Sequence, residues 1–271
     1  MNQRTYTVVS LFSGAMGLDI GLEESGRIKV IACVERNPVF CESIKANRDA
    51  GRTRERRLKV YEGDISELDP EEIMQDLGLR PRQLDILVGG PPCQSFSTAG
   101  RRGTVRDPRG SLIWQFIRYV KAFQPKVFLM ENVRGLVSSP IRHRPIKDRP
   151  ENGGRPLRPE ERPGSVLRLF ARDLGLLDPP YRVDAFEVNA VNYGAPQLRE
   201  RLLLIGNRFN ASVSFPPPTH GQVSSQNGSY PESGLLPFAT LGDVIKGVRE
   251  ENPVIMDFSD RKKRYLSLVP P

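Results

Sequence analysis

The sequence predicts an α/β fold with an open parallel sheet, and two observations lead to this prediction. Short apolar runs alternate along the chain with segments whose apolar residues recur at helical spacing. Several of these runs stop at glycine, proline or acidic residues, as strands do where they reach the ligand-binding edge of such a sheet. The chain has 271 residues, of which 38% are hydrophobic, so it can bury a sizeable core.

The first two predicted strands surround a glycine turn. A strand over residues 6–12 runs into the small residues 13–17, and a helix follows at 18–23. The next strand, 28–34, ends at Glu35 and precedes a helix over 39–47. This spacing is typical of nucleoside-binding proteins, in which a carboxylate at that place accepts hydrogen bonds from both ribose hydroxyls. The alternatives are an ordinary tight turn and a solvated charge at a helix start.

A third strand at 58–61 is followed by Asp64, which could accept the amino group of an adenine. The alternative role for Asp64 is an N-cap of the helix near 70–77. Asp69 fits that role better, so the sequence leaves Asp64 free for a ligand.

The fourth strand, 84–88, leads through two glycines and two prolines to Cys93. Cys93 therefore follows the carboxyl end of a strand, on a stiff turn, where a thiolate can attack a ligand. The alternative is a buried structural cysteine, which is the usual environment of a free thiol. Polar neighbours such as Gln94 and Ser97 favour the nucleophile. A basic loop over 98–109, which includes Arg101 and Arg102, is suited to phosphate contacts or is merely solvated.

A helix over 110–122 precedes the fifth strand, 126–130, which ends at Glu131. Adjacent parallel strands end at the same edge, so Glu131 is expected beside Cys93; a strand-end Glu can instead hold a backbone amide. After a helix at 166–174 come two more strands, 181–191 and 199–206. Arg199 and Arg201 share one face of the last strand, which favours an anionic or polar partner over two exposed surface arginines.

Two stretches do not fit the α/β pattern. Residues 138–164 form an insertion rich in proline and arginine, expected to be extended or partly disordered, and either to touch a nucleic-acid backbone or to be solvated. We therefore expect a catalytic domain over 1–206 that carries this insertion, and a region over 207–271 that begins as a linker and contains a short helix at 241–248.

The composition limits the class of partner and the cellular compartment that we expect for this protein. A formal net charge of +8 points to a polyanion, most naturally nucleic acid. Cys33, Cys41 and Cys93 cannot all pair, and with His143 and His220 they match no zinc pattern, so we expect a reducing cytosol and no metal. Since the chain shows neither a secretory segment nor a membrane-spanning run, we expect a soluble protein.

Four motifs in order resemble those of the DNA cytosine-5 methyltransferase family. They read Leu11-Phe12-Ser13-Gly14-Ala15-Met16-Gly17-Leu18, Pro92-Cys93-Gln94, Glu131-Asn132-Val133 and Gln197-Leu198-Arg199-Glu200-Arg201, and the match covers roughly residues 5–206. The resemblance implies a Rossmann-like fold that binds S-adenosylmethionine, with seven strands, mostly parallel, one antiparallel strand, and helices on both faces. It also implies duplex DNA as the partner, restriction-modification as the setting and the cytosol of a prokaryote, on DNA, as the location.

The resemblance further implies roles for individual residues. The cofactor residues would be Phe12, Ser13, Gly14, Ala15, Met16, Gly17, Leu18, Glu35, Arg36, Asp64, Ile65, Pro92 and Leu112, and the DNA-binding residues Gln94, Ser97, Arg101 and Arg102. Cys93 would add to carbon 6 of a flipped-out cytosine, which makes carbon 5 nucleophilic enough to accept a methyl group. Glu131 would assist at ring nitrogen 3. Arg201 would hold the carbonyl oxygen at carbon 2, although the sequence does not separate its duty from that of Arg199.

The sequence departs from the family pattern at two places. Met16 stands where many relatives have glycine. The target-recognition region and the last two motifs are not recognisable after Asn207, so we expect either a truncated chain or one subunit of a split enzyme with poor activity alone. The alternative hypotheses for its function are a non-autonomous DNA-binding or assembly subunit, an RNA cytosine methyltransferase and, least favoured, a nicotinamide dehydrogenase.

Overall fold

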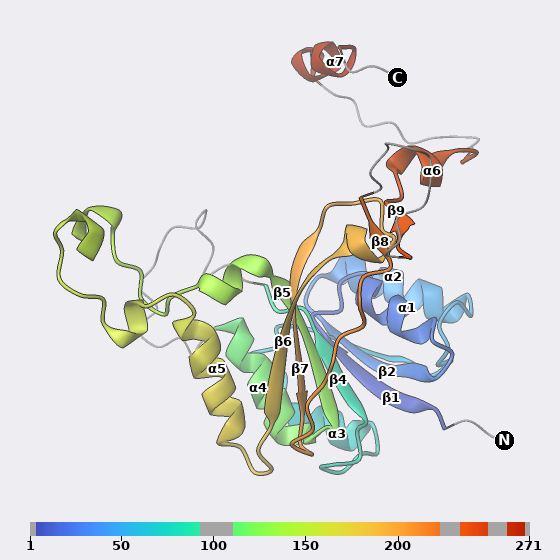
Figure 1. Cartoon of the computed structure of the whole chain (residues 1–271). Helices are drawn as coiled ribbons and strands as arrows, with labels where there is room; N and C mark the ends of the chain where they lie inside the picture. The colour runs from blue at the N-terminus through green and yellow to red at the C-terminus, as the bar shows by residue number, and fades with distance from the viewer. Residues whose placement is uncertain (1–3, 93–110, 223–233, 249–258, 269–271) are drawn as a thin grey trace.

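A computed structural model describes residues 4–92, 111–222, 234–248 and 259–268 of the chain. Its centre is a seven-stranded sheet in the order β3-β2-β1-β4-β5-β7-β6 (Figure 1). The strands are β1 (Tyr6–Leu11), β2 (Ile28–Glu35), β3 (Lys59–Glu62), β4 (Ile86–Gly89), β5 (Val127–Val133), β6 (Arg182–Asn189) and β7 (Glu200–Asn207). Strands β1 to β5 pair in parallel, and β7 runs antiparallel to both of its neighbours. The predicted sheet with one reversed strand is confirmed.

Helices cover both faces of the sheet, which explains why its central strands are almost continuously apolar. On one face Val8, Val30 and Val88 pack in a cluster beside α1 (Gly17–Glu23) and α2 (Pro38–Asp49). On the other face Val9, Leu87 and Phe128 belong to the larger cluster. That cluster is completed by α3 (Pro70–Asp76), α4 (Leu112–Phe123) and α5 (Ser165–Gly175). Figure 1 shows α1 and α2 on one side of the sheet and α4 and α5 on the other.

The helix starts follow local sequence signals. Asn37 and Asp69 accept hydrogen bonds from the backbone N–H groups of Val39 and Glu71, each followed by a proline at the first helical position. Asp69 is thus the cap of α3, as the sequence predicts.

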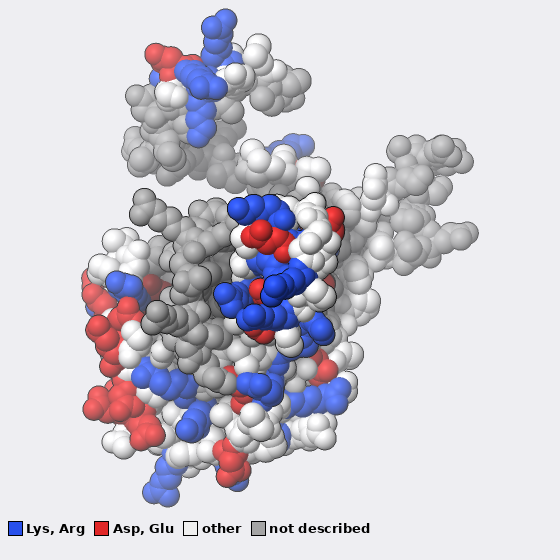
Figure 2. All heavy atoms as spheres, turned by 90° about the vertical axis from the view of Figure 1, so that its left-hand side faces the viewer, with Lys and Arg blue, Asp and Glu red and all other residues white. Residues whose placement is uncertain are grey.

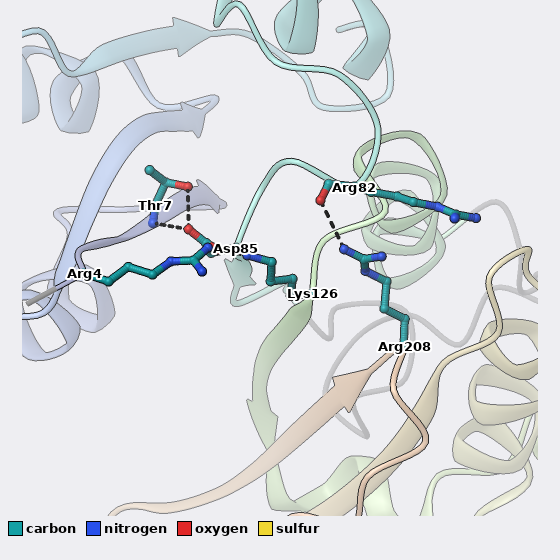
Figure 3. A network of polar contacts seen from close by, with 6 residues as sticks. All are labelled: Arg4, Thr7, Arg82, Asp85, Lys126 and Arg208. Atoms are coloured by element: carbon teal, nitrogen blue, oxygen red, sulfur yellow. Dashed lines mark hydrogen bonds and ion pairs between the residues drawn. The ribbon is translucent and has the colours of Figure 1, made fainter.

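A polar network closes the amino edge of the sheet (Figure 3). Asp85, just before β4, accepts hydrogen bonds from the backbone N–H of Thr7 at 3.1 Å and from Lys126 Nζ at 2.5 Å. Arg4 adds an ion pair at 3.1 Å. Beside this network Arg208 donates to the carbonyl oxygen of Arg82 at 3.1 Å. These contacts tie β1, β4, β5 and the end of β7 together.

The insertion differs from its prediction. Prolines do exclude strands and α-helices from its described residues, but the segment folds into three short 3₁₀ turns, η3 (Ile146–Asp148), η4 (Pro150–Asn152) and η5 (Pro159–Glu161), after η2 (Arg134–Ser138). Another 3₁₀ turn, η6 (Ala190–Tyr193), follows β6.

Beyond β7 the chain forms a two-stranded sheet of β8 (His220–Gly221) and β9 (Leu236–Pro237), then α6 (Leu241–Ile245) and α7 (Asp260–Leu266). The short helix at 241–248 is confirmed in its first five residues, whereas β8, β9 and α7 have no counterpart in the sequence analysis. None of the helices within the described residues is long and apolar enough to cross a lipid bilayer.

Candidate active site

The antiparallel pairing of β5 with β7 brings Glu131 and the two arginines together at the carboxyl edge of β5. Arg201 lies opposite Val133 in this register, and its Nε donates to Glu131 Oε1 at 2.5 Å. Arg199, which immediately precedes β7, places Nη2 3.7 Å from the same oxygen. The expected polar partner of the two guanidiniums is therefore the carboxylate of Glu131 itself, whose side chain keeps 28% of its surface exposed.

The second oxygen of Glu131 faces the turn that leads to Cys93. A Cβ atom added to Gly90 would lie 3.4 Å from Glu131 Oε2. At Gly89 an added Cβ would meet the carbonyl oxygen of Leu11 at 2.8 Å, so only glycine allows β4 to end so close to β1. The turn is thereby held against both the carboxylate and the end of β1.

Asn132 fixes this turn, a role that the sequence analysis missed. Its buried side chain donates from Nδ2 to the carbonyl oxygen of Pro91 at 3.0 Å and accepts from the backbone N–H of Val133. An amide can do both because it carries a donor and an acceptor. The signal available in the sequence was its place beside Glu131 at a strand end. Cys93 follows Pro92 directly, but it lies outside the described residues, as do Gln94, Ser97, Arg101 and Arg102.

A cavity of about 440 Å³ opens between the glycine turn after β1 and the end of β4. Its lining comprises Ser10, Leu11, Phe12, Ser13, Gly17, Leu18, Asp19, Gly89, Gly90, Glu131 and Arg199. Four predicted cofactor residues, Phe12, Ser13, Gly17 and Leu18, thus share one space with two predicted catalytic residues. The volume lies in the range of small-ligand sites, and the mixture of backbone, hydroxyl and apolar groups suits a nucleoside joined to an amino acid. On these grounds the site fits S-adenosylmethionine. A second hollow of about 570 Å³ adjoins it and shares Arg199.

The glycine turn adopts an unusual backbone conformation. Phe12, Gly14 and Met16 have φ angles of 54°, 52° and 66°, all in the left-handed region. A methionine at position 16 therefore has a cost, since a side chain disfavours this region. Its side chain is buried among Val8, Val30 and Val88, which offsets the strain by packing. Ala15, the remaining residue of the turn, is exposed.

Glu35 already has partners in the protein. Its Oε2 accepts the backbone N–H of Gly14 and its Oε1 that of Asn37, both at 2.8 Å. The carboxylate therefore fastens the glycine turn to the end of β2. Each oxygen retains a second lone pair, so the predicted hydrogen bonds with a ribose are chemically compatible with this arrangement.

Asp64 also has partners within the protein, which the inference drawn from the better cap at Asp69 did not anticipate. Its Oδ1 accepts the hydroxyl and backbone N–H of Ser66 at 2.6 and 2.9 Å, and its Oδ2 lies 3.2 Å from Arg36 Nη1. The Ser66 hydroxyl, followed by its N–H, lowers the pKa of Asp64. Asp64 closes its own turn because short acidic side chains reach backbone groups two residues ahead. Ile65 is buried, and Leu112 is half-buried at the start of α4.

Asp19 is a second residue that the sequence analysis missed. It lines the cavity in the first turn of α1 and is 1% exposed, and its Oδ1 has no hydrogen-bond partner among the described residues. Burial raises the pKa of this carboxyl to about 6, against a hydrogen bond with Ser10 that lowers it. The signal in the sequence was an acidic residue within an otherwise apolar helical pattern. Groups of three potential metal ligands are absent from the described part of the chain.

Comparisons with known proteins show which proteins this chain resembles. The family model described as C-5 cytosine-specific DNA methylase matches residues 6–147. Type II methyltransferase M.AquIA from a Picosynechococcus strain is 34% identical, over 91% of this chain and 90% of its own length. M1.HphI from Haemophilus parahaemolyticus is 33% identical over 81% of this chain, and M.NgoFVII from Neisseria gonorrhoeae 30% identical over 97%. The chain spans only 50% and 59% of those two relatives.

Solved structures give the same fold. A crystal structure described as a DNA modification methyltransferase encoded within an E. coli prophage matches with a TM-score of 0.60 and 25% identity, over 93% of this chain and 57% of that one. The Spodoptera frugiperda DNMT2 structure matches with a TM-score of 0.51 and 21% identity, over 78% of this chain and 52% of that one. The second likeness concerns the fold alone.

Proposed function

This chain belongs to the C-5 cytosine-specific DNA methylase family, and from that premise we propose that it transfers a methyl group from S-adenosylmethionine to carbon 5 of a cytosine flipped out of duplex DNA, through a covalent bond to Cys93. The observation that supports the proposal best is the single cavity whose wall contains the glycine turn, Glu131 and Arg199. A methyl donor bound on the turn would lie next to the groups that activate the base.

The chemistry requires a nucleophile next to the cytosine ring. Carbon 5 of cytosine is too weak a nucleophile to accept a methyl group, and addition of a thiolate at carbon 6 places electron density on it. After methyl transfer, loss of the carbon-5 proton expels the thiolate and restores the aromatic ring. The rigid turn from Gly89 to Pro92, held by Asn132, supports Cys93 as that thiolate.

Glu131 would protonate or hydrogen-bond ring nitrogen 3 while the thiolate adds. Both arginines approach Oε1, which leaves Oε2 on the side of the Cys93 turn. This arrangement favours a division of duties that the sequence leaves open. Arg201 positions the carboxylate and holds the carbonyl oxygen at carbon 2, whereas Arg199, half exposed, reaches toward the second hollow and a phosphate.

S-adenosylmethionine, when bound, supplies an electrophilic methyl group on a sulfonium. Phe12, Ser13, Gly17 and Leu18 would hold its methionine end within the cavity. Glu35 and Asp64 stand at or just beyond the ends of the next two strands, where the ribose and adenine would follow. Arg36, Ile65, Pro92 and Leu112 complete the proposed set.

Exposed apolar side chains support a second polypeptide as the source of target recognition. Leu236, Leu241, Val244, Ile245 and Val248 are between 53% and 72% exposed, and they follow one another around β9 and α6. Such a patch marks an interaction surface when it is contiguous. We propose that it packs against the polypeptide that carries the target-recognition region. Addition of that polypeptide should raise the methylation rate of wild type, and replacement of Leu241 and Ile245 by Gln should remove the gain.

The test of the reaction is covalent trapping. Duplex DNA of mixed sequence that contains 5-fluorocytosine is incubated with the protein and S-adenosylmethionine. Because fluorine cannot leave as a proton does, the adduct persists and should appear as a protein–DNA band on a denaturing gel. Cys93→Ala should give no band. Cys41→Ala, which removes a buried thiol elsewhere, should leave the band intact. A band from Cys93→Ala, or methylation of ordinary DNA by that variant, would contradict the proposed nucleophile.

A further inference from the structure

The insertion between η2 and α5 is an ordered arm rather than a flexible loop. We define the basic arm as residues 139–164, which include η3, η4 and η5. It leaves the sheet one 3₁₀ turn after Glu131 and projects beyond the rest of the catalytic domain (Figure 1). Figure 2 looks directly onto this side and shows Lys and Arg side chains gathered on it.

A buried ion pair fixes the shape of the arm. Arg144 donates through Nε and Nη2 to both oxygens of Glu161, at 3.2 and 2.5 Å, and the two side chains are only 14% and 7% exposed. The backbone N–H of Arg158, followed by the Arg144 guanidinium, lowers the pKa of Glu161. At the base, Ser165 Oγ accepts the N–H of Ile141 at 2.8 Å and donates to the carbonyl oxygen of Glu160 at 3.0 Å. The arm is therefore held in one conformation before any ligand arrives.

Acidic side chains of the arm are paired within it, whereas several of its basic side chains are exposed to solvent. The arm has seven basic and four acidic residues, a formal charge of +3 within a total of +8. Glu161 is paired with Arg144, and Glu151 lies 3.9 Å from Arg149. Among the exposed cations of the arm, Lys147, Arg155, Arg158 and Arg162 form no ion pair with the described residues. Their charge is available to an external polyanion.

The arm also carries a concave feature. A hollow of about 380 Å³ is lined by Arg144, Lys147, Asp148, Asn152, Gly153, Gly154 and Arg155. A Cβ at Gly154 would approach the carbonyl oxygen of Asp148 to 2.0 Å, so the turn that forms the wall requires glycine. Asn152 and the backbone N–H groups of Gly153 and Gly154 already donate to carbonyl oxygens within the arm. Lys147 and Arg155, which form no ion pair with the described residues, are the groups in this lining that can bind a phosphate. The carboxylate of Asp148 in the same wall opposes an anion.

We propose that the basic arm binds the phosphate backbone of duplex DNA beside the cytosine that enters the active site. The arm starts at the same carboxyl edge that carries Glu131, and a duplex presents one charge about every 1.7 Å of its axis, so DNA placed at that edge continues past the arm. The proposal rests on the proposed function, because it takes DNA as the substrate. It adds a contact surface outside the residues of the reaction.

The experiment compares two quadruple variants that lose the same charge. The arm variant is K147Q/R155Q/R158Q/R162Q. The control is R27Q/R52Q/R56Q/R57Q, whose four exposed arginines precede β2 and β3 at the opposite edge of the sheet. Binding of the full chain to a fluorescent duplex is measured by anisotropy from 20 to 200 mM salt. Binding of S-adenosylmethionine is measured by calorimetry as a check on the fold.

Each phosphate contact contributes about 0.9 to the slope of log K against log salt concentration, so the arm variant should flatten that slope by about 2 to 4 and weaken binding at least about tenfold at 100 mM. The control should change the slope by less than about 1. Asp148→Asn, which removes the opposing charge, should tighten binding. S-adenosylmethionine affinity should stay unchanged in all three.

Equal slopes for the arm variant and the control, with wild type bound to DNA, would overturn the arm proposal and leave the proposed function intact. Weaker binding by Asp148→Asn would also contradict it. Failure of wild type to bind duplex DNA even at 20 mM salt would overturn the proposed function, and the arm proposal with it.

Discussion

At each edge of the sheet a carboxylate lies among basic side chains, but the two carboxylates have different roles. At the amino edge, Asp85 is 8% exposed in its side chain and bonds to Lys126, Thr7 and Arg4. At the carboxyl edge, Glu131 is 28% exposed and is approached by Arg201 and Arg199 through one oxygen only. Both are carboxylates among cations at the end of a strand. One uses both oxygens within the protein, and the other keeps Oε2 turned toward the Cys93 turn.

This difference separates stability from chemistry. A buried carboxylate whose hydrogen bonds are complete contributes to the fold, and its loss leaves a cation without a partner. A carboxyl group with an oxygen that faces the ligand site can exchange a proton with a substrate. The carboxyl edge also contains an oxygen of Asp19 without a hydrogen-bond partner in the described part of the chain, and the left-handed backbone of Met16. We therefore expect mutations there to affect turnover or to relieve strain, and mutations at the amino edge to affect unfolding.

The largest expected effect is the loss of turnover in Glu131→Gln. Glutamine keeps the shape but cannot exchange a proton with the base, so the single-turnover methylation rate at saturating DNA should fall by about 10²- to 10⁴-fold. The unfolding midpoint in urea should barely change. Glu187→Gln, which alters an exposed carboxylate paired with Arg134, is the matched control. A rate within tenfold of wild type would contradict the assignment of a chemical role to Glu131.

The next effect is on stability, in Asp85→Asn. Removal of the carboxylate leaves Lys126 facing an amide, and we expect a loss of about 3 kcal/mol in the free energy of unfolding, with normal turnover of the folded protein. Burial opposes ionisation of Asp85, but the hydrogen bonds from Lys126 and Thr7 outweigh it and hold its pKa below the usual value. Its contribution should therefore be present above about pH 4 and be lost as the pH falls further. If the Asp85→Asn variant is as stable as wild type but turns over slowly, the amino edge contributes to the reaction and not to stability, contrary to our assignment.

Asp19→Asn should stabilise the protein in a pH-dependent way. The folded pKa of Asp19, about 6, lies above the value of a free carboxyl, so the folded state binds more protons than the unfolded state between about pH 4 and 6. Wild-type stability consequently falls as the pH rises through that window. The variant should be more stable than wild type by about 2 kcal/mol at pH 7.5 and equal to it at about pH 4.

Urea denaturation at both pH values measures this effect. Glu24→Gln, which changes an exposed carboxyl at the end of α1, is the control and should show no pH-dependent gain. A gain that is equal at both pH values would mean that the ionised carboxyl carries no penalty.

The smallest expected effect compares Met16→Gly with Met16→Ala. Both variants lose the same buried side chain, but only glycine relieves the left-handed backbone, so the glycine variant should be more stable by about 1 kcal/mol. This order is the reverse of the usual one in a helix. If the alanine variant is equal or better, the turn stores no strain.

Several elements follow from local sequence alone. The central strands were predicted to within two or three residues because parallel strands covered on both faces are short apolar runs, such as 84–88. Asp69 was predicted as a cap because Pro70 follows it. The ordered arm was not predicted, since the ion pair between Arg144 and Glu161 joins residues that are 17 positions apart.

The sequence by itself determined the order of strands and helices, the residue types at each strand end and hence the family, because hydrophobic period and turn residues act over a few positions. Only the tertiary structure decided which hydrogen bonds and ion pairs the charged side chains at those strand ends form. It gave both oxygens of Glu35 to backbone amides, bound Asp64 to Ser66 and Arg36, and set Arg201 and Arg199 on one oxygen of Glu131. The physical reason is that a charged side chain takes whichever partner the fold brings within reach, and strand register, not sequence distance, sets that reach.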